Sequence, residues 1–490
     1  MDGVTLALIG KVNQKIENLD GFVYALANAK RYGFRWDKVN AKGTRLYDAA
    51  AITLDTTNFG HFSAVNASYN NPFDGLYPWR DRKLCNVDLA LYYSNYIAGN
   101  YDMIDAVIAW EGDPDFSLTG GTGIFVGPYT PGFWGKADYT SAYNDYIVAD
   151  MPIAGYRYYK PTIGARWHGV AEGTGINSKV GMPVTGETMS AMHTRATTMA
   201  LTLDDIWSYS ATSLLASVEY ATLNHQTAIG KGVDSVYVQG IRPYIEETDV
   251  TRVVMTDAQA ASFFAGVIID IGTSDGGRQI ASRIVTSVED YPADSAYSIV
   301  NFDGAAINTL SAHYVSAHGV SNLETPEILS TSGYIGTNGK ANAYYRGQVH
   351  HANLWRYCLG AYRETLTSKV WTAVDPAGAA AVDALNTSVH RDTGLVLPTG
   401  DAGIALSGYL GGLLQGEIPL APFGSADGGT DANPVGDYLY VPSPATGNTV
   451  LLVGGYTGDG AYSGRFGGHW GSSASYSSWN VGALPFLRTP

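Results

Sequence analysis

Cysteine is scarce in this chain of 490 residues, which contains only Cys85 and Cys358. They lie far apart, and neither has a second cysteine two to four residues away, so the sequence predicts no zinc site and no disulfide framework. A chain of this length can bury large cores without cross-links of either kind. We therefore expect two buried thiols.

Charged residues are also few, at 15% of the chain, and the acidic ones prevail to give a formal charge of −15. Nucleic acids and anionic membranes require a basic face, so neither is expected as the main partner. No apolar run reaches the roughly 18 residues of a membrane span, and the N-terminus lacks the pattern of a secretory signal. The sequence predicts a soluble protein made in the cytoplasm.

The familiar motifs of enzymes and metal sites are missing as well. The one Gly-x-Ser-x-Gly match, Gly272–Gly276, lies between two strand-like runs and not before a helix, so it is no hydrolase elbow, and there is no Gly-Lys-Ser/Thr phosphate loop. His313 and His318 are not at the i, i+4 spacing of a helical zinc pair, and His350 and His351 are adjacent. The sequence therefore predicts a protein that is not an enzyme and that holds no metal and no other cofactor.

Glycine and tyrosine are abundant instead, with 58 and 34 residues, a composition typical of β-rich proteins with polar, uncharged surfaces. In residues 1–31, apolar residues from Ile9 to Leu26 follow the 3,4 alternation of a coiled-coil seam. This pattern predicts a short N-terminal helix that joins three copies, or a helix packed on its own domain. Residues 32–160 show short alternating runs between turn pairs, which predict an irregular β-rich attachment region.

A helix is predicted next, opened by a capping box of Thr202 and Asp205 and ending by Gly230. Its apolar side carries Ile206, Leu214, Leu215 and Val218. Residues 250–304 change to strand-like runs separated by Gly, Asp and Ser, which predict a small inserted β-barrel or sandwich. Residues 161–249 and 305–490 then form the domain that carries this insertion.

Three separated parts of the chain carry a family resemblance. Leu214–Ala221 ends in Glu-Tyr-Ala, His351–Tyr357 contains Asn-Leu-Trp, and the C-terminus combines Leu451–Gly455, Gly467–Trp470 and Asn480–Gly482. In this order they resemble the C-type-lectin-like fold shared by formylglycine-generating enzymes and the variable proteins of diversity-generating retroelements. The closing segment departs from the family pattern, because five extra residues precede its arginine.

Upstream segments are similar to phage and prophage fibre-like proteins that carry the same fold: Arg31–Phe34, Asn58–Phe62, Trp167–Gly169 and Asn224–Val233. The resemblance implies a fold class that is α+β and β-rich. A C-type-lectin-like domain would carry the small β-barrel or sandwich insertion and follow the short N-terminal helix and the irregular β region. Paired cysteines for formylglycine chemistry and the Glu-Pro-Asn or Gln-Pro-Asp triplets of calcium-dependent lectins are both missing.

The segment from Tyr456 to Trp479 consists mostly of Gly, Ser, Tyr, Trp, His, Ala and Asp, between apolar flanks. This is the composition of antibody binding loops, in which aromatic rings supply contact area and small polar residues adapt to the ligand. In the resembled variable proteins, this segment is diversified and points outward. The predicted ligand-binding residues are Tyr456, Asp459, Tyr462, Arg465, His469, Trp470, Ser472, Ser475, Tyr476, Ser478 and Trp479. Trp470 and Trp479 have a second interpretation as partly buried scaffold residues, and Asn480 is expected to form a turn.

The resemblance implies a host-adhesion protein of the virion, at a phage tail fibre or tail tip. Its expected partners are a host cell-surface receptor, either protein or glycan, and other virion proteins through the N-terminal region. A homotrimer is expected to raise avidity. Two alternatives stay open, namely a virion decoration or head-fibre protein and a glycan-cleaving tailspike, although no acid pair for the latter is recognisable.

Overall fold

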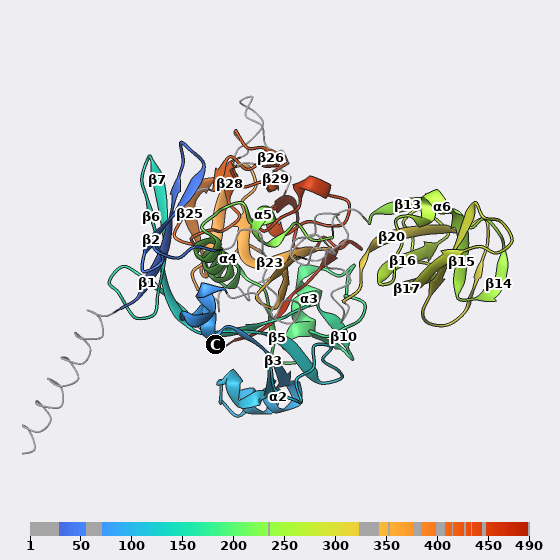
Figure 1. Ribbon diagram of the computed structural model, residues 1–490, viewed down its shortest axis with the longest axis horizontal. Helices are drawn as coiled ribbons and strands as arrows, with labels where there is room; N and C mark the ends of the chain where they lie inside the picture. The colour runs from blue at the N-terminus through green and yellow to red at the C-terminus, as the bar shows by residue number, and fades with distance from the viewer. Residues whose placement is uncertain are drawn as a thin grey trace, which may run out of the picture.

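The computed structural model describes residues 29–54, 71–233, 236–322, 343–350, 353–375, 384–397, 407–413, 415–425, 428–432, 434–442 and 447–488. The predicted N-terminal helix and coiled coil lie almost wholly outside the described residues, as does the segment Asn58–Phe62. A body of packed sheets carries one smaller β unit that projects from it (Figure 1).

Two antiparallel sheets of the body contain the strands of the predicted attachment region. The first has the order β2-β1-β7-β6-β8, with β1 (Arg31–Asp37), β2 (Lys42–Tyr47), β6 (Phe133–Tyr139), β7 (Tyr143–Ala149) and β8 (Arg157–Tyr159). The second has the order β12-β33-β9-β5-β3-β4, with β3 (Lys83–Asp88), β4 (Val107–Trp110), β5 (Ile124–Thr130), β9 (Thr162–Gly164), β12 (Thr202–Leu203) and β33 (Pro485–Arg488). The C-terminal strand β33 thus completes a sheet that begins with residues 83–88.

The third sheet has the order β25-β24-β23-β30-β31-β29-β26, and β32 pairs with β23 in parallel. Its strands are β23 (Trp355–Arg363), β24 (Lys369–Ala373), β25 (His390–Val396), β26 (Gly408–Tyr409), β29 (Tyr438–Tyr440), β30 (Thr449–Val453), β31 (Gly468–Ser472) and β32 (Val481–Gly482). Its two faces belong to different cores, because Leu451 and Val453 pack in one hydrophobic cluster and Val450 and Leu452 in another.

Short hairpins and 3-10 turns complete the body. The hairpins pair β10 (Val170–Glu172) with β11 (Gly175–Asn177), β21 (Ala343–Tyr345) with β22 (Gln348–His350), and β27 (Gly412–Leu413) with β28 (Gly424–Ser425). The 3-10 turns are η2 (Pro72–Gly75), η3 (Trp79–Asp81), η4 (Met103–Ala106) and η8 (Gly460–Tyr462). Both cysteines are buried and form no disulfide.

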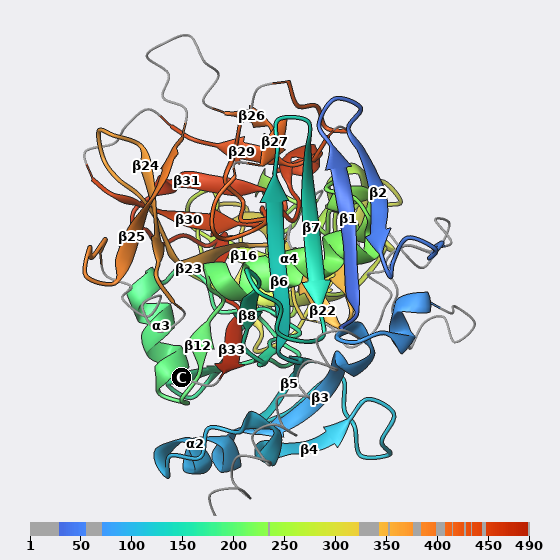
Figure 2. The ribbon, with the colours of Figure 1, turned by 90° about the vertical axis from the view of Figure 1, so that its left-hand side faces the viewer.

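Helix α4 (Ile206–Tyr220) lies at the centre of the body and is almost completely buried. Figure 2 shows it lying across the strands of the first sheet. The carboxylate of Asp205 accepts hydrogen bonds from the amides of Trp207 and Ser208, so Asp205 is the N-cap. The predicted opening at Thr202 is wrong, because that residue lies in β12. The other α-helices in the described ranges are α2 (Leu89–Ile97), α3 (Met189–Thr197), α5 (His225–Ile229) and α6 (Asp257–Ala260).

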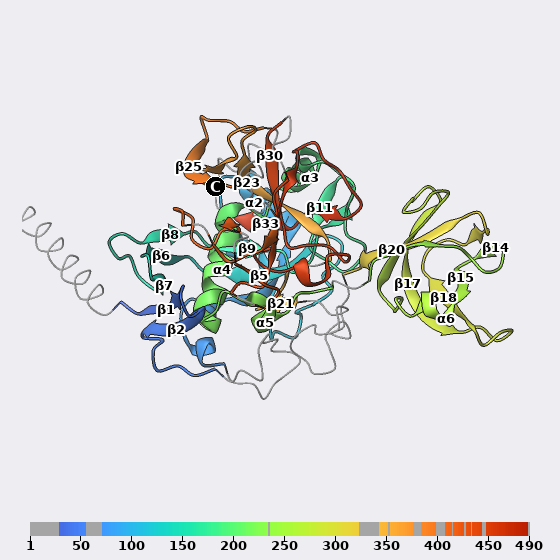
Figure 3. The ribbon, with the colours of Figure 1, turned by 90° about the horizontal axis from the view of Figure 1, so that it is seen from above.

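The projecting unit has its own hydrophobic core, formed by residues from Val233 to Val320. Its sheet has the order β13-β20-β16-β17-β18-β15, and β14 pairs with β19 beside it. The strands are β13 (Val238–Ile241), β14 (Glu247–Val250), β15 (Arg252–Thr256), β16 (Val267–Gly272), β17 (Ala281–Asp290), β18 (Tyr297–Phe302), β19 (Ile307–Thr309) and β20 (Tyr314–Val320). Figure 3 shows it extending away from the body. The predicted bounds, 250–304, are too narrow because they omit β13 and β20.

The predicted fold class, α+β with a separate C-type-lectin-like domain, is wrong. Strands account for about 40% of the described residues and helices for 14%, and the strands form several antiparallel sheets. The helices form no layer of their own, because α4 is enclosed by strands. The division at residue 160 also fails, since β5, β9 and β33 are neighbours in one sheet. The body is a β-rich unit in which early and late parts of the chain share cores.

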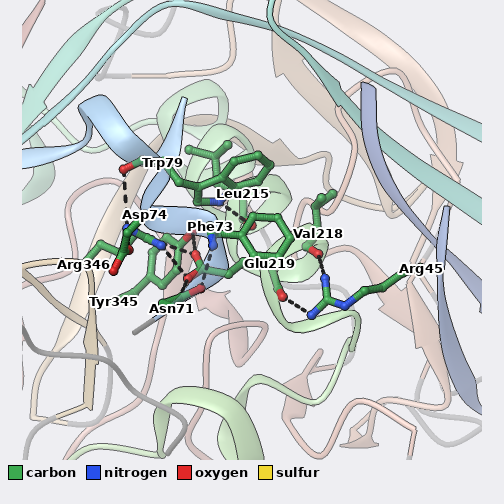
Figure 4. Close-up of polar contacts among 10 residues, drawn as sticks. All are labelled: Arg45, Asn71, Phe73, Asp74, Trp79, Leu215, Val218, Glu219, Tyr345 and Arg346. Atoms are coloured by element: carbon green, nitrogen blue, oxygen red, sulfur yellow. Dashed lines mark hydrogen bonds and ion pairs between the residues drawn. The ribbon is translucent and has the colours of Figure 1, made fainter. Parts of the chain in front are cut away.

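A buried ion pair fixes the C-terminal end of α4 (Figure 4). The carboxylate of Glu219, which has no exposed surface, accepts hydrogen bonds from Arg346 Nε at 2.8 Å and from the Tyr345 hydroxyl at 2.9 Å. The Asn71 amide also donates to it, and Arg346 reaches Asp74 at 2.9 Å. Burial raises the pKa of Glu219, but the charge of Arg346 and these hydrogen bonds outweigh burial and leave the pKa below its usual value.

Replacing Arg346 by methionine should destabilise the protein by about 3–5 kcal/mol, because it leaves Glu219 as an unpaired charge in the core. Chemical denaturation followed by tryptophan fluorescence measures this change. Arg80→Met is the matched control, since Arg80 pairs with Asp81 at the surface and its loss should have a much smaller effect. Equal effects of the two substitutions would show that the pair has no special role.

Candidate binding pocket

A pocket of about 370 Å³ opens on the third sheet, on the face that carries Val450 and Leu452. Its size lies within the range usual for ligand sites. It is lined by Trp355, Tyr438, Tyr440, Leu452, Tyr456, Asp459, Tyr462, Gly468, His469, Ser472, Tyr476, Asn480 and Val481. The lining is thus dominated by aromatic rings and small polar groups.

Strand pairing brings the rings together from distant parts of the sequence. β29 and β31 pair in parallel, so that Tyr440 lies beside His469. Their rings stack at a centroid distance of 4.7 Å. Because side chains alternate along a strand, Leu439 and Trp470 point to the opposite face and are fully buried against the core around α4. The alternation therefore directs one set of aromatic residues to the pocket and the other to the core.

The loop that carries Tyr456 and Tyr462 is anchored at its base by Arg465. This guanidinium is 2% exposed and donates from Nη2 to the Tyr209 carbonyl at 2.7 Å and from Nε to Ser213 Oγ at 3.0 Å. The central carbon of the guanidinium also lies 4.0 Å from the centroid of the Tyr209 ring, which is a cation–π contact. The end of the loop is therefore held on helix α4.

Asp437 provides a second anchor next to the first. Its carboxylate accepts hydrogen bonds from the Phe466 amide and from Gln226 Nε2, and burial raises its pKa to about 7. Gly464 lies so close that a Cβ atom there would come within 1.8 Å of Asp437 Oδ1. Only glycine fits at position 464, which explains one of the glycines in this segment.

The structure divides the eleven predicted ligand-binding residues into three groups. Six line the pocket together: Tyr456, Asp459, Tyr462, His469, Ser472 and Tyr476. Ser475 is exposed outside it, while Ser478 and Trp479 are partly buried nearby. The ligand-binding prediction is wrong for Arg465 and Trp470, which are buried against the core. For Trp470 the second interpretation, a scaffold residue, agrees with this burial, so the segment is not wholly a surface.

Sequence reasoning missed four polar or aromatic lining residues: Trp355, Tyr438, Tyr440 and Asn480. The pattern Tyr438-Leu439-Tyr440 carried a signal, since it places both tyrosines on the side opposite the leucine. Asn480 lies in a turn as expected, closed by the Val481 amide and the Ser478 carbonyl at 3.1 Å, and it also lines the pocket. Its carbonyl accepts a hydrogen bond from the Trp355 amide at 2.9 Å, and its Oδ1 has no hydrogen-bond partner within the described part of the chain.

The projecting β unit contacts the body beside the pocket, at Trp479. Tyr237, which precedes β13, stacks on the Trp479 ring with centroids 5.5 Å apart, and Tyr456 meets the same ring edge-on at 5.7 Å. Arg278 of this unit donates to the Trp479 carbonyl at 3.3 Å and pairs with the buried carboxylate of Asp270 at 2.8 Å. The unit thus packs against one end of the segment that forms the pocket.

Burial controls the charge of the two titratable side chains whose ordinary pKa lies below neutrality. Asp459 Oδ2 accepts a hydrogen bond from the Tyr456 amide at 2.8 Å, and burial raises the pKa of Asp459 to about 7. His469 Nδ1 accepts from the Gly471 amide at 3.2 Å, and burial lowers the pKa of His469 to about 4. At pH 7 the imidazole is neutral and the carboxyl group is near its midpoint.

Comparison with known proteins adds no relatives. No model of a known protein family matches the sequence, and no curated protein matches it. Within the described ranges, no helix is long and apolar enough to cross a membrane. The same part of the chain contains no group of three or more His, Cys, Asp or Glu side chains that could hold a metal ion.

The substitution Asp459→Asn should make stability less dependent on pH. The pKa of Asp459 is raised in the folded state, so its contribution is fully present below pH 4 and is lost as pH rises through about 7. Between pH 5 and pH 8 the unsubstituted protein should therefore lose on the order of 1–3 kcal/mol more stability than the variant. Denaturant titrations of both proteins at the two pH values measure this difference, and parallel losses would contradict the assignment.

Proposed function

We propose that this chain is a receptor-binding protein of a phage tail fibre or tail tip, which attaches the virion to the host surface through the pocket on the third sheet. The observation that carries the proposal is the composition of this pocket. Six residues of one Gly/Ser/Tyr-rich segment meet three aromatic residues from other strands around a single concavity. Such a combination of rigid rings and small polar groups is typical of recognition surfaces.

The pocket combines exposed rings with a rigid support. Tyr462 and Tyr476 are 48% and 39% exposed, so a ligand can cover them. The base of the loop is bound to α4 through Arg465, and the floor consists of paired strands. A site held in shape before binding loses little conformational entropy when the ligand arrives. This pre-organisation supports recognition as its purpose.

The lining favours adhesion over cleavage of a glycan. Glycosidases require two carboxyl groups on either side of the scissile bond, and Asp459 is the one carboxyl group among the lining residues. Adhesion through a single pocket is weak, and several copies on one particle would raise the avidity. A homotrimer joined through the N-terminal segment, which would also contact other virion proteins, supplies those copies.

Replacing Tyr462 and Tyr476 together by alanine should reduce binding to host cells at least tenfold, because both rings cover ligand area without supporting the core. The measurement is binding of fluorescently labelled full-length protein to a panel of bacterial strains. Tyr93→Ala is the matched control, since Tyr93 is 44% exposed on α2 and does not line the pocket.

Thermal unfolding of the double variant should match that of the unsubstituted protein, which separates lost binding from lost folding. The proposal would be contradicted if the protein bound a strain strongly and the double variant bound that strain equally well. Binding of the purified protein to phage particles but to no strain would favour the decoration or head-fibre protein instead.

A further inference from the structure

The carboxyl group of Asp459 lies in the pocket without a cation of its own. No lysine or arginine is among the lining residues that the structure describes. The pKa of Asp459 is raised by burial, and within the described part of the chain the Tyr456 amide donates a hydrogen bond to its carboxylate. A buried carboxyl group usually has a cationic or hydrogen-bonding partner, since burial of an unpaired charge is costly. None of the described lining residues supplies a cation for this carboxylate, so a cationic ligand can fill that role.

The other titratable side chains that line the pocket are five tyrosines and one histidine. The tyrosines are Tyr438, Tyr440, Tyr456, Tyr462 and Tyr476. Burial raises the pKa of Tyr438 and of Tyr456 above the usual value. Burial lowers the pKa of His469 to about 4, so this imidazole is neutral. Nothing in the lining repels a cation, and the π-faces of aromatic rings attract one.

We propose, resting on the proposed function, that the pocket binds a methylated ammonium group of the choline type on the host surface, with Asp459 as its counter-ion. Aromatic rings beside a carboxylate form the usual receptor for quaternary ammonium ions. A primary ammonium such as lysine is more strongly hydrated and gains less from ring faces. An anionic ligand would find no positive charge among the lining residues, and a neutral ligand would leave the negative charge of Asp459 uncompensated by the lining.

The test compares choline with 3,3-dimethyl-1-butanol, which has nearly the same shape and no charge. Isothermal titration of the full-length protein at pH 8 should show at least tenfold tighter binding of choline. Choline affinity should also rise about thirtyfold between pH 5.5 and pH 8, because the cation binds the ionised form of Asp459, whose pKa is about 7. Asp459→Asn should remove both the preference and the pH dependence, while Tyr93→Ala should change neither.

Equal binding of choline and its neutral analogue would overturn the inference, and so would binding of methyl glycosides or N-acetyl-lysine amide without binding of choline. Absence of binding by all probes would overturn it too. Loss of cell binding in the tyrosine double variant, without choline competition, would contradict the ligand class but leave the adhesion function standing. If the unsubstituted protein binds choline but the tyrosine double variant still binds cells, the adhesion function of the pocket would be contradicted instead.

The methylated ammonium has two possible carriers, a choline-bearing surface polymer or a methylated lysine of a surface protein. Treating the host cells with protease separates these sources. Binding that survives protease and is competed by choline identifies the polymer. Binding that disappears with protease and is competed by choline identifies the protein.

Discussion

The buried carboxylate of Glu219 is the constraint on which the arrangement of the body depends. It meets Arg346 and Tyr345 from the β21–β22 hairpin and Asn71 from the start of η2. Arg45 of β2 donates to the last carbonyls of the same helix, Val218 and Glu219. A buried ion pair adds little net stability, but an arrangement that separates its members is expensive. The pair therefore selects the one packing in which these distant segments meet around α4.

Helix α4 connects this ion pair to the pocket. One side of it packs on the first sheet, and its backbone and Ser213 hold the guanidinium of Arg465. Arg465 in turn fixes the end of the loop that carries Tyr456, Asp459 and Tyr462. The pocket is thus rigid at its floor and anchored at its base, while its tyrosines remain exposed. Substitutions of the exposed tyrosines would leave the shape of the pocket unchanged, because the groups that anchor it, such as Arg465, are buried in the core.

The sequence alone predicted which segment forms the pocket but not which side each residue faces. Composition identified Tyr456–Trp479, and six of its predicted residues do line one concavity. Arg465 was misjudged because a buried cation is rare, and only the fold brings Tyr209 and Ser213 to it. For Trp470 the composition left two interpretations open, and its place in the alternation along β31 decides for the buried one. Tyr438 and Tyr440 were missed since their pairing with β31 joins residues about thirty positions apart.

The fold was less predictable than the segment. A helix between Thr202 and Gly230 and an inserted β unit were expected, yet the class and the domain division were wrong. Strand β33 pairs with β9 and β12, far upstream in the sequence, and such long-range pairing leaves no local signal. Short strands rich in glycine and tyrosine also have a weak hydrophobic periodicity. The sequence therefore did not indicate that residues 32–160 share a sheet with the C-terminal strand.

The most direct test of the central claim is to place a photo-crosslinking p-benzoylphenylalanine at position 476 of the full-length protein, and at position 93 as a reference. After binding to a susceptible host and irradiation, a host-surface component should be attached at position 476 and not at position 93. Attachment of host material at position 93 alone, or of another virion protein at position 476 when whole particles are used, would contradict the assignment of the pocket to host binding.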